Sequence, residues 1–327
     1  MTRWILVHGD SDGVVCGALA YAFYGRGNVY FTHPAGLLED LSVVKPGDSV
    51  FVGDIALSEP EAREVLEKLS LLAEKGEVVY VDHHPLPEGI SKSDVPGTFV
   101  HALDASASEL TYKLFQEKLP PEGERLALFG AIGNYLDQTP WVKRAMENWD
   151  KRCIYFEAGV LAQGLENSRR MHDFKRHVVK HLASWRLPSD VSELLVRALV
   201  ETVNEEEMRL FVKQNVQRLA HVAYVVDPPG SVSRAATYAR AVAEKPVGVA
   251  VELRKKQAVM SLRSVDPAVD LNELLRKLAK EFGGTGGGHP NAAGARVPLE
   301  KFNLFLEVLD EEVGMRLAWK GGPGSRR

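Results

Sequence analysis

Cysteine is scarce in this sequence, with only Cys16 and Cys153 among 327 residues. Two distant cysteines provide neither a disulfide framework nor the paired Cys-x-x-Cys pattern of a zinc site. Apolar runs are short, and none reaches the ~20 residues that a membrane-spanning helix needs. The start, MTRWILVHGD, also lacks the apolar core and cleavage pattern of a secretory signal peptide. We therefore expect a cytoplasmic protein without a membrane segment.

An excess of charge of one sign is also missing. The chain has 40 Lys and Arg residues against 44 Asp and Glu residues, a formal net charge of −4. This balance does not indicate nucleic-acid binding, although a local basic face would still permit it. One basic stretch, Arg169–Arg186, contains Phe174 and Trp185, and fits either a solvated helix face or a track for a nucleic-acid backbone. Asn and Gln are few beside Lys, Arg and Glu, which is typical of a thermophile.

The first half of the chain alternates short apolar runs with amphipathic stretches. Strands are predicted at 4–7, 29–32, 49–53 and 77–81, and helices at 13–24, 60–73, 106–118 and 122–135. Nearly continuous apolar strands that alternate with helices indicate an α/β fold with a doubly wound parallel sheet. The length of the chain is sufficient for two domains.

Strand character stops at about Trp141 and returns at His221. Helices are predicted between these points, followed by a smaller α/β domain with a hairpin across 255–257 and a last helix. We predict four segments: a catalytic domain over 1–185, a helical connector over 186–220, the smaller domain over 221–315 and a disordered tail over 316–327.

Metal-binding side chains gather where predicted strands end. They are His8, Asp10 and Asp12 after the first strand, Asp54 after the third, Asp82, His83 and His84 after the fourth, and the more distant Asp137. The carboxyl ends of parallel strands share the sheet edge where ligands bind. Clustered carboxylates repel one another, and each would have a raised pKa unless a cation were present. The sequence therefore predicts a metal site at this edge.

The composition of this set favours particular ions. Carboxylates with one or two imidazoles suit Mn²⁺ or Mg²⁺, and Mn²⁺ more because of the nitrogen ligands. The set is too large for one ion, and two ions roughly 3.5–4 Å apart are usual in phosphate-ester hydrolysis. Each motif alone has a plainer interpretation, since DHH and DxDG both occur in turns and Asp54 could cap a helix. The joint occurrence at strand ends favours the metal site.

Five of the six residues 283–288 are glycine, within FGGTGGGHPNAAG. We expect neither a helix nor a β-ladder there, but a loop whose N–H groups face an anion, with His289 donating to a phosphate. The alternative is a flexible hinge. Arg263, near the end of a predicted strand, could bind phosphate or be an ordinary surface arginine.

These motifs resemble a known family. HGDSDG, Gly53–Asp54, Asp82–His84 and Asp137 are similar, in order, to the four motifs of the DHH phosphoesterase superfamily, and SLRS with GGTGGGHPNAAG resembles its DHHA1 domain. His8 lies two residues before Asp10, a spacing most similar to the RecJ-type branch. The length of this chain is similar to that of compact archaeal RecJ-like nucleases of the type associated with the fork-repair helicase Hef.

The resemblance implies a site with two Mn²⁺ or Mg²⁺ ions. One ion would be held by Asp10, Asp54 and His8, and the other by Asp12, Asp54, His83 and Asp137. Among the catalytic residues, Asp54 would bridge the ions, Asp82 would orient His83, and His84 would face the scissile phosphate. Substrate would be bound by Arg263, Gly286, Gly287, Gly288 and His289.

The function implied by the resemblance is that of a two-metal phosphodiesterase. We expect a single-strand-specific exonuclease on DNA or RNA, with 3′→5′ polarity and a role in DNA repair. Expected partners are single-stranded nucleic acid or short oligonucleotides, a fork-repair helicase or nuclease, and further copies of the chain. The same motifs fit an oligoribonuclease, a pAp phosphatase or a cyclic-dinucleotide phosphodiesterase. An inert scaffold is a third hypothesis, which predicts missing ligands.

Overall fold

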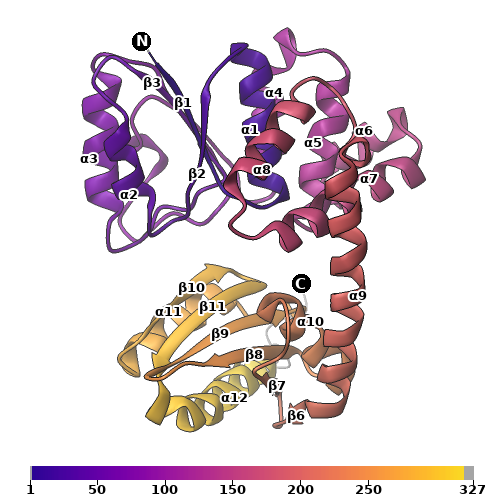
Figure 1. Cartoon of the computed structure of the whole chain (residues 1–327). Helices are drawn as coiled ribbons and strands as arrows, with labels where there is room; N and C mark the ends of the chain where they lie inside the picture. The colour runs from indigo at the N-terminus through magenta and orange to yellow at the C-terminus, as the bar shows by residue number, and fades with distance from the viewer. Residues whose placement is uncertain (1, 320–327) are drawn as a thin grey trace, which may run out of the picture. The chain divides into compact units, whose positions relative to one another are not determined.

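The structure is a computed structural model that describes residues 2–319, and it divides into two compact units (Figure 1). The first unit ends at Glu201 and the second begins at Thr202, so the boundary falls within helix α9 (Ser192–Asn215). The last helix, α12 (Phe302–Trp319), includes residues 316–319, for which a disordered tail was predicted. The rest of that predicted tail, residues 320–327, lies outside the described residues.

Five parallel strands form the sheet of the first unit, in the order β2-β1-β3-β4-β5. They are β1 (Arg3–Val7), β2 (Asn28–Phe31), β3 (Ser49–Gly53), β4 (Val78–Asp82) and β5 (Thr98–His101). The predicted parallel α/β sheet is confirmed, and the four predicted strands lie within one residue of these bounds. The prediction missed β5, a four-residue edge strand whose side chains are all exposed or half-buried.

Helices cover both faces of this sheet because its strands alternate their apolar side chains between the two faces (Figure 1). Ile5 and Val7 of β1 pack in one core with α1 (Ser11–Tyr24), α4 (Ala107–Phe115), α5 (Glu122–Gly133), α7 (Lys151–Ser168) and α8 (His172–Leu182). Leu6 of the same strand packs in a second core with α2 (Leu37–Asp40) and α3 (Ala62–Ala73). This layering leaves the loops after β1, β3 and β4 together at the carboxyl edge of the sheet.

The second unit contains a six-stranded mixed sheet in the order β10-β11-β9-β8-β7-β6. Its strands are β6 (Gln217–Arg218), β7 (Val222–Val226), β8 (Val247–Leu253), β9 (Gln257–Ser264), β10 (Thr285–His289) and β11 (Ala292–Pro298). Strands β8 and β9 form the predicted hairpin. Helices α11 (Leu271–Glu281) and α12 share one apolar core with the sheet, whereas α10 (Val232–Ala243) lies in another.

The glycine-rich run is a strand, so the prediction of a loop was wrong. Residues 285–289 form β10, which pairs antiparallel with β11. A Cβ atom at Gly286 would lie 2.7 Å from the carbonyl oxygen of Leu275 in α11, so the absence of a side chain permits close helix–strand packing. Gly287 and Gly288 also have φ values of 151° and 148°, which residues with a side chain rarely adopt. Close packing and backbone conformation explain why glycines can form this ladder.

One carboxylate of α12 holds the start of β7. Asp310 accepts hydrogen bonds from the backbone N–H groups of Ala220 at 3.2 Å and of His221 and Val222 at 2.7 Å. We expect Asp310→Ala to lower the free energy of unfolding by about 2–3 kcal/mol, because it removes a charged acceptor from three donors. Urea unfolding followed by circular dichroism measures this change. The exposed neighbour Glu311, replaced with Ala, is the control, and an equal loss in both variants would contradict the prediction.

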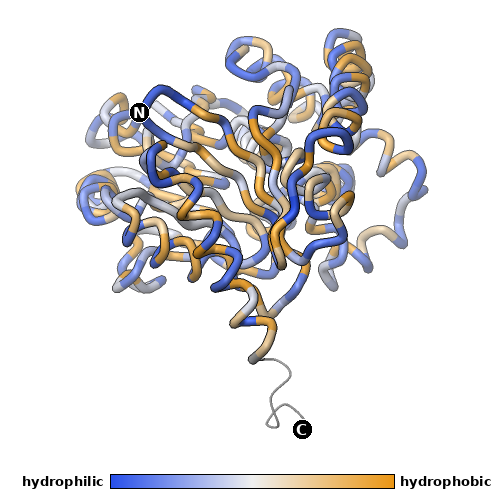
Figure 2. Tube along the Cα trace, turned by 90° about the horizontal axis from the view of Figure 1, so that it is seen from below, coloured by the Kyte–Doolittle hydropathy of each residue, from blue (hydrophilic) through white to orange (hydrophobic). Residues whose placement is uncertain are grey.

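None of the helices within residues 2–319 is long and apolar enough to cross a membrane. Hydrophobic and hydrophilic residues alternate over short distances along the traced chain (Figure 2).

Candidate metal centre

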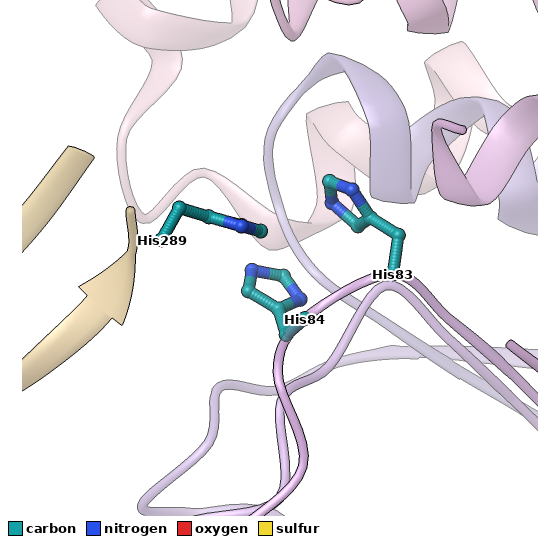
Figure 3. Close-up of side chains that lie close together, drawn as sticks. All are labelled: His83, His84 and His289. Atoms are coloured by element: carbon teal, nitrogen blue, oxygen red, sulfur yellow. The ribbon is translucent and has the colours of Figure 1, made fainter. Parts of the chain in front are cut away.

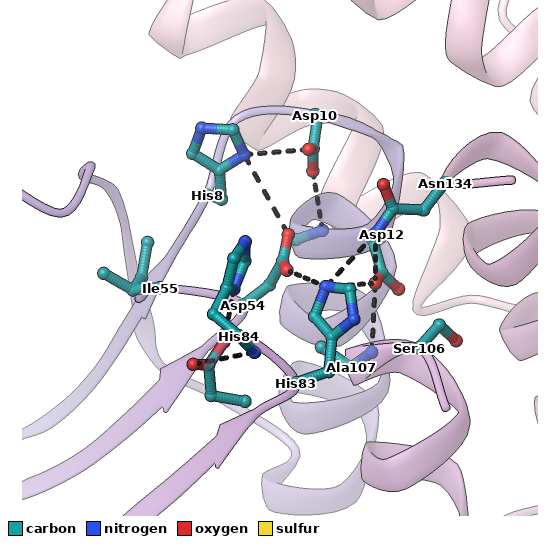
Figure 4. A network of polar contacts seen from close by, with 12 residues as sticks. His8, Asp10, Asp12, Asp54, Ile55, His83, His84, Ser106, Ala107 and Asn134 are labelled. Carbon is teal, nitrogen blue, oxygen red and sulfur yellow. Dashed lines mark hydrogen bonds and ion pairs between the residues drawn. The ribbon is translucent and has the colours of Figure 1, made fainter. Parts of the chain in front are cut away.

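The loop after β1 places two carboxylates at the start of α1. Asp10 is the N-cap of α1, and its Oδ1 accepts the N–H of Gly13 at 3.0 Å. The Nδ1 atom of His8 lies 2.9 Å from the other oxygen of Asp10 (Figure 4). Asp12, in the first turn of α1, is completely buried. A Cβ atom at Gly13 would lie 2.4 Å from the carbonyl oxygen of His8, so this tight turn requires glycine.

Asp54, directly after β3, lies at the centre of the cluster. Its Oδ1 is 3.4 Å from Nε2 of His83, and its Oδ2 is 3.9 Å from Nδ1 of His8 (Figure 4). Potential ligand atoms within 4.8 Å of one another form overlapping sets in this unit: His8, Asp10 and Asp54; Asp12, Asp54 and His83; and Asp54, Asp82 and His84. Asp54 belongs to all three, which is the arrangement that a bridging ligand needs. Its backbone is left-handed (φ 60°), a conformation that is uncommon for non-glycine residues and that aspartate adopts more readily than most.

The two histidines after β4 have different surroundings. Their rings meet edge to face, with centroids 4.6 Å apart (Figure 3). His83 is buried, and its Nε2 points toward Asp54 and lies 3.9 Å from Asp12 Oδ2. Asp82 contacts His84, with 2.8 Å between its Oδ1 and the ring Nδ1 and 3.2 Å between its Oδ2 and the backbone N–H. The structure thus pairs Asp82 with His84, whereas we predicted that it orients His83.

His101, at the end of β5, supports the same loop. Its Nε2 lies 2.7 Å from the carbonyl oxygen of His84, and β5 pairs with β4 so that His101 is opposite Asp82. His101 was not among the predicted site residues because β5 itself was not predicted. A short Thr-Phe-Val-His run before the predicted helix at 106–118 was the available signal.

Asp12 is held by the amino end of α4. Its two oxygens accept the backbone N–H group of Ala107 at 3.0 Å (Figure 4) and that of Ser108 at 2.8 Å. Helix N-terminal N–H groups carry partial positive charge, so this contact provides hydrogen-bond donors to both oxygens of a buried carboxylate. The side-chain amide of Asn134, at the carboxyl end of α5, lies 3.2 Å from both Asp12 Oδ2 and His83 Nε2. Neither contact was predicted, because both depend on how separate helices pack.

Asp137, the eighth predicted ligand-type residue, has other contacts. Its Oδ2 accepts hydrogen bonds from Gln138 Nε2 at 3.0 Å and from the Tyr155 hydroxyl at 3.3 Å. Among the described residues, it belongs to none of the sets of potential metal ligands. The other predicted metal ligands of this unit do lie together. The residue at the end of α5 that reaches them is Asn134, not Asp137.

A buried lysine lies next to the loop after β1. Lys175 of α8 is 6% exposed, and its Nζ donates a 2.5 Å hydrogen bond to the carbonyl oxygen of Gly9, between His8 and Asp10. Burial lowers the pKa of Lys175, while the charge of Asp10 acts in the opposite direction. This residue of the predicted basic stretch therefore supports the site from inside the domain. The aromatic members of the stretch, Phe174 and Trp185, pack against the core.

The electrostatics of the cluster call for a cation. Burial, together with the charges of Asp10 and Asp12, raises the pKa of Asp54 well above its usual value. Its Oδ1 is buried and has no hydrogen-bond partner within the described residues. A divalent ion would satisfy this oxygen and keep the carboxylate ionised. Carboxylates and imidazoles at these distances therefore fit Mn²⁺ or Mg²⁺, with Asp10, Asp54 and His8 around one position and Asp12, Asp54 and His83 around another.

Ion binding should release protons in a way that depends on pH. The charge of Asp10 raises the pKa of His8 to about 9, although burial opposes the shift, so its imidazole is protonated at pH 7. A cation competes with that proton. We expect Mg²⁺ binding to release protons at about pH 7 and to release fewer protons above about pH 9. The affinity for Mg²⁺ should rise as the pH increases from about 7 to about 9. Titration calorimetry in two buffers of different ionisation enthalpy measures the release, and identical heats in both buffers at pH 7 would contradict the prediction.

The predicted substrate-binding residues lie in the second unit. Arg263 of β9 donates to Ser261 Oγ at 3.2 Å and to the carbonyl oxygen of Leu262 at 2.8 Å, and it contacts Ser233. Gly286, Gly287 and Gly288 lie in β10, where the N–H of Gly288 donates to Asn272 at 3.0 Å, and His289 ends the strand. Their role in substrate binding stays a prediction.

Comparison with known proteins identifies one domain and one relative of this chain. Residues 220–315 match the model of the DHHA1 domain. The uncharacterized protein MJ0988 of Methanocaldococcus jannaschii is 27% identical over 251 residues, which cover 73% of this chain. The aligned region spans 65% of the length of that relative.

Solved structures share the fold at low sequence identity. RecJ of Thermus thermophilus in complex with Mn²⁺ superposes with a TM-score of 0.65 and 17% identity, over 96% of this chain and 52% of RecJ. The DHH-domain protein PF0399, described as a member of the s1p family of ribosomal proteins, has a TM-score of 0.74 and 15% identity, over 95% and 86% of the chains. The pGpG-specific phosphodiesterase PggH of Vibrio has a TM-score of 0.60 and 13% identity, over 97% and 100%.

Proposed function

We propose that this chain, whose residues 220–315 match the DHHA1 domain, is a DHH/DHHA1-type two-metal phosphodiesterase that acts as an exonuclease on single-stranded nucleic acid. The observation that carries the proposal is the position of Asp54, which takes part in all three ligand sets of the first unit. Two Mn²⁺ or Mg²⁺ ions bound there would supply Lewis-acid stabilisation of the charge that develops on a phosphate. The hypothesis of an inert scaffold predicts missing ligands, whereas Asp10, Asp12, Asp54 and His83 converge.

In this proposal the side chains of the first unit have separate roles. Asp10, Asp12, Asp54 and His83 hold the ions, with His8 as a further ligand beside Asp10. His84 faces the substrate phosphate, and its Nδ1 is held by Asp82. Although burial acts to lower it, the carboxylate of Asp82 raises the pKa of His84. A protonated His84 would be able to donate a hydrogen bond or a proton to a phosphate oxygen or a leaving oxygen.

The form of the substrate is the finer part of the proposal. Exposed basic residues on and before α8, among them Arg169, Arg170 and Lys180, support binding of a phosphate backbone by charge. In the second unit, Arg263, Gly286–Gly288 and His289 are proposed to bind a substrate phosphate. We further propose that the enzyme degrades single strands with 3′→5′ polarity and that it takes part in DNA repair in the cytoplasm of a thermophilic archaeon. Its proposed protein partners are a fork-repair helicase and further copies of the same chain.

A second candidate is a phosphodiesterase of very short substrates, such as an oligoribonuclease, a pAp phosphatase or a cyclic-dinucleotide enzyme. It is favoured by the fold similarity to PggH, which extends over the full length of that protein. The two candidates share the metal chemistry and differ in the length of substrate that they accept.

A product ladder separates these candidates. Matched DNA and RNA oligonucleotides of graded length, labelled at either end, are incubated with the full chain and Mn²⁺. We expect mononucleotides to be removed one at a time from the 3′ end of long single strands. Release from the 5′ end alone would reverse the proposed polarity. Activity confined to substrates of a few nucleotides would favour the second candidate, and no hydrolysis with either ion would overturn both.

A further inference from the structure

We propose that Asn134 completes the ligand set of the ion held by Asp12, Asp54 and His83, through its side-chain oxygen, and that Asp137 does not belong to this set. The inference rests on the proposed function, because it assumes that the cluster binds metal ions. It assigns a ligand that is neither a carboxylate nor an imidazole and that the sequence motifs did not indicate.

The position of Asn134 carries the inference. Its side-chain Nδ2 lies 3.2 Å from Asp12 Oδ2 and 3.2 Å from His83 Nε2 (Figure 4). Asp12 Oδ2 and His83 Nε2 are 3.9 Å apart, and His83 Nε2 is 3.4 Å from Asp54 Oδ1. Neighbouring ligand atoms around an octahedral ion at 2.0–2.1 Å are separated by about 3 Å. The amide is therefore near the distance expected for another ligand of the same ion.

The side-chain amide of Asn134 can interact with the site both in the absence and in the presence of an ion. Without an ion, the NH₂ group places partial positive charge between a carboxylate oxygen and an imidazole nitrogen. With an ion between those atoms, a rotation of the terminal torsion by about 180° exchanges nitrogen for oxygen without backbone movement. Carbonyl oxygens suit Mg²⁺ and Mn²⁺ as ligands. One residue can therefore hold the cluster together in the absence of the ion and bind the ion when it arrives.

The end of α5 explains why Asn134 rather than Asp137 reaches the cluster. Asn134 is the C-cap of α5, and its backbone N–H is bonded to the carbonyl oxygen of Gly130 at 3.1 Å. Tyr135 then adopts a left-handed conformation (φ 60°), which turns the chain. Asp137 follows this turn and is hydrogen-bonded to Gln138 and Tyr155 instead.

A neutral ligand changes the charge of the site. The proposed set has two carboxylates, one imidazole and one amide, whereas a set with Asp137 would have three carboxylates. Ligand charge is one of the factors that set the affinity of a site for a divalent ion. We expect Asn134→Asp to bind this ion about tenfold more tightly, and Asn134→Ala to bind it at least about tenfold more weakly.

The test is Mn²⁺ binding to the full chain, stripped with EDTA, followed by electron paramagnetic resonance of free Mn²⁺. Asn134→Ala and Asn134→Asp are compared with Asp137→Asn and with the exposed control Asn28→Ala. Thermal unfolding in EDTA shows whether each variant is folded. We expect the wild type to bind two ions. Asn134→Asp should strengthen the binding of one of these ions, and Asn134→Ala should weaken it. Asp137→Asn and Asn28→Ala should bind Mn²⁺ as the wild type does.

The outcomes separate this inference from the proposed function. If the wild type binds two ions and Asn134→Asp binds them with unchanged affinity, the inference is overturned while the proposed function stands. Weakening of one ion by Asp137→Asn also overturns it, because it would place Asp137 in the set. If the wild type binds no Mn²⁺, both the proposed function and the inference are overturned. Asn134→Asp keeps the test decisive if Asn134→Ala fails to fold, because it preserves the size of the side chain.

Discussion

Asp54→Asn is expected to reduce the affinity for both ions and to lower the rate of phosphodiester hydrolysis by at least about 1,000-fold, equivalent to roughly 4 kcal/mol. The reason is that Asp54 belongs to every ligand set of the first unit, so the loss of its charge affects both ion positions. The substitution keeps the shape of the side chain, and it removes a buried carboxylate whose pKa is raised by burial. Hydrolysis and Mn²⁺ binding are measured on the same preparations.

The same substitution should leave the fold intact and even stabilise it in EDTA. An amide in place of Asp54 removes the repulsion with Asp10 and Asp12 that exists when no cation is bound. Glu64→Gln, an equivalent change at an exposed position of α3, is the matched control and should alter neither ion binding nor hydrolysis. If Asp54→Asn retained both ions, a bridging role for Asp54 would be ruled out.

His84→Gln is expected to show a different pattern, with hydrolysis lowered about 100- to 10,000-fold and Mn²⁺ binding nearly unchanged. His84 is held at Nδ1 by Asp82, and it is proposed to face the substrate rather than to hold an ion. The measurement combines steady-state hydrolysis with an Mn²⁺ titration. Parallel losses of ion binding and hydrolysis would show instead that His84 is a metal ligand.

Asp82→Asn extends this prediction to the residue that orients His84. The substitution removes the carboxylate that raises the pKa of His84. We therefore expect the pKa of His84 to fall, and the pH at which hydrolysis declines to become lower. The sign follows from the direction of the shift, because a lower pKa means that His84 loses its proton at a lower pH. An unchanged pH profile would contradict the pairing of Asp82 with His84 as a functional contact.

The elements near the site show why some predictions held. The strands β1, β3 and β4 are short apolar runs followed directly by polar residues, so their carboxyl ends could be located within one residue from the sequence. In a parallel sheet these ends must meet at one edge, which brought Asp10, Asp54 and His83 together without knowledge of the loops. The edge strand β5 has no such apolar run and was missed, and with it His101.

The sequence by itself determined the parallel sheet and the chemical character of its carboxyl edge, because strand periodicity and the order of residues along a strand are local properties. Only the tertiary structure decided which side chains meet across elements. It paired Asp82 with His84, placed Asn134 rather than Asp137 beside Asp12, and paired the glycine run with β11 as a strand. These contacts depend on the turn at the end of α5, the direction of each side chain and the packing of α11, which no spacing along the chain specifies.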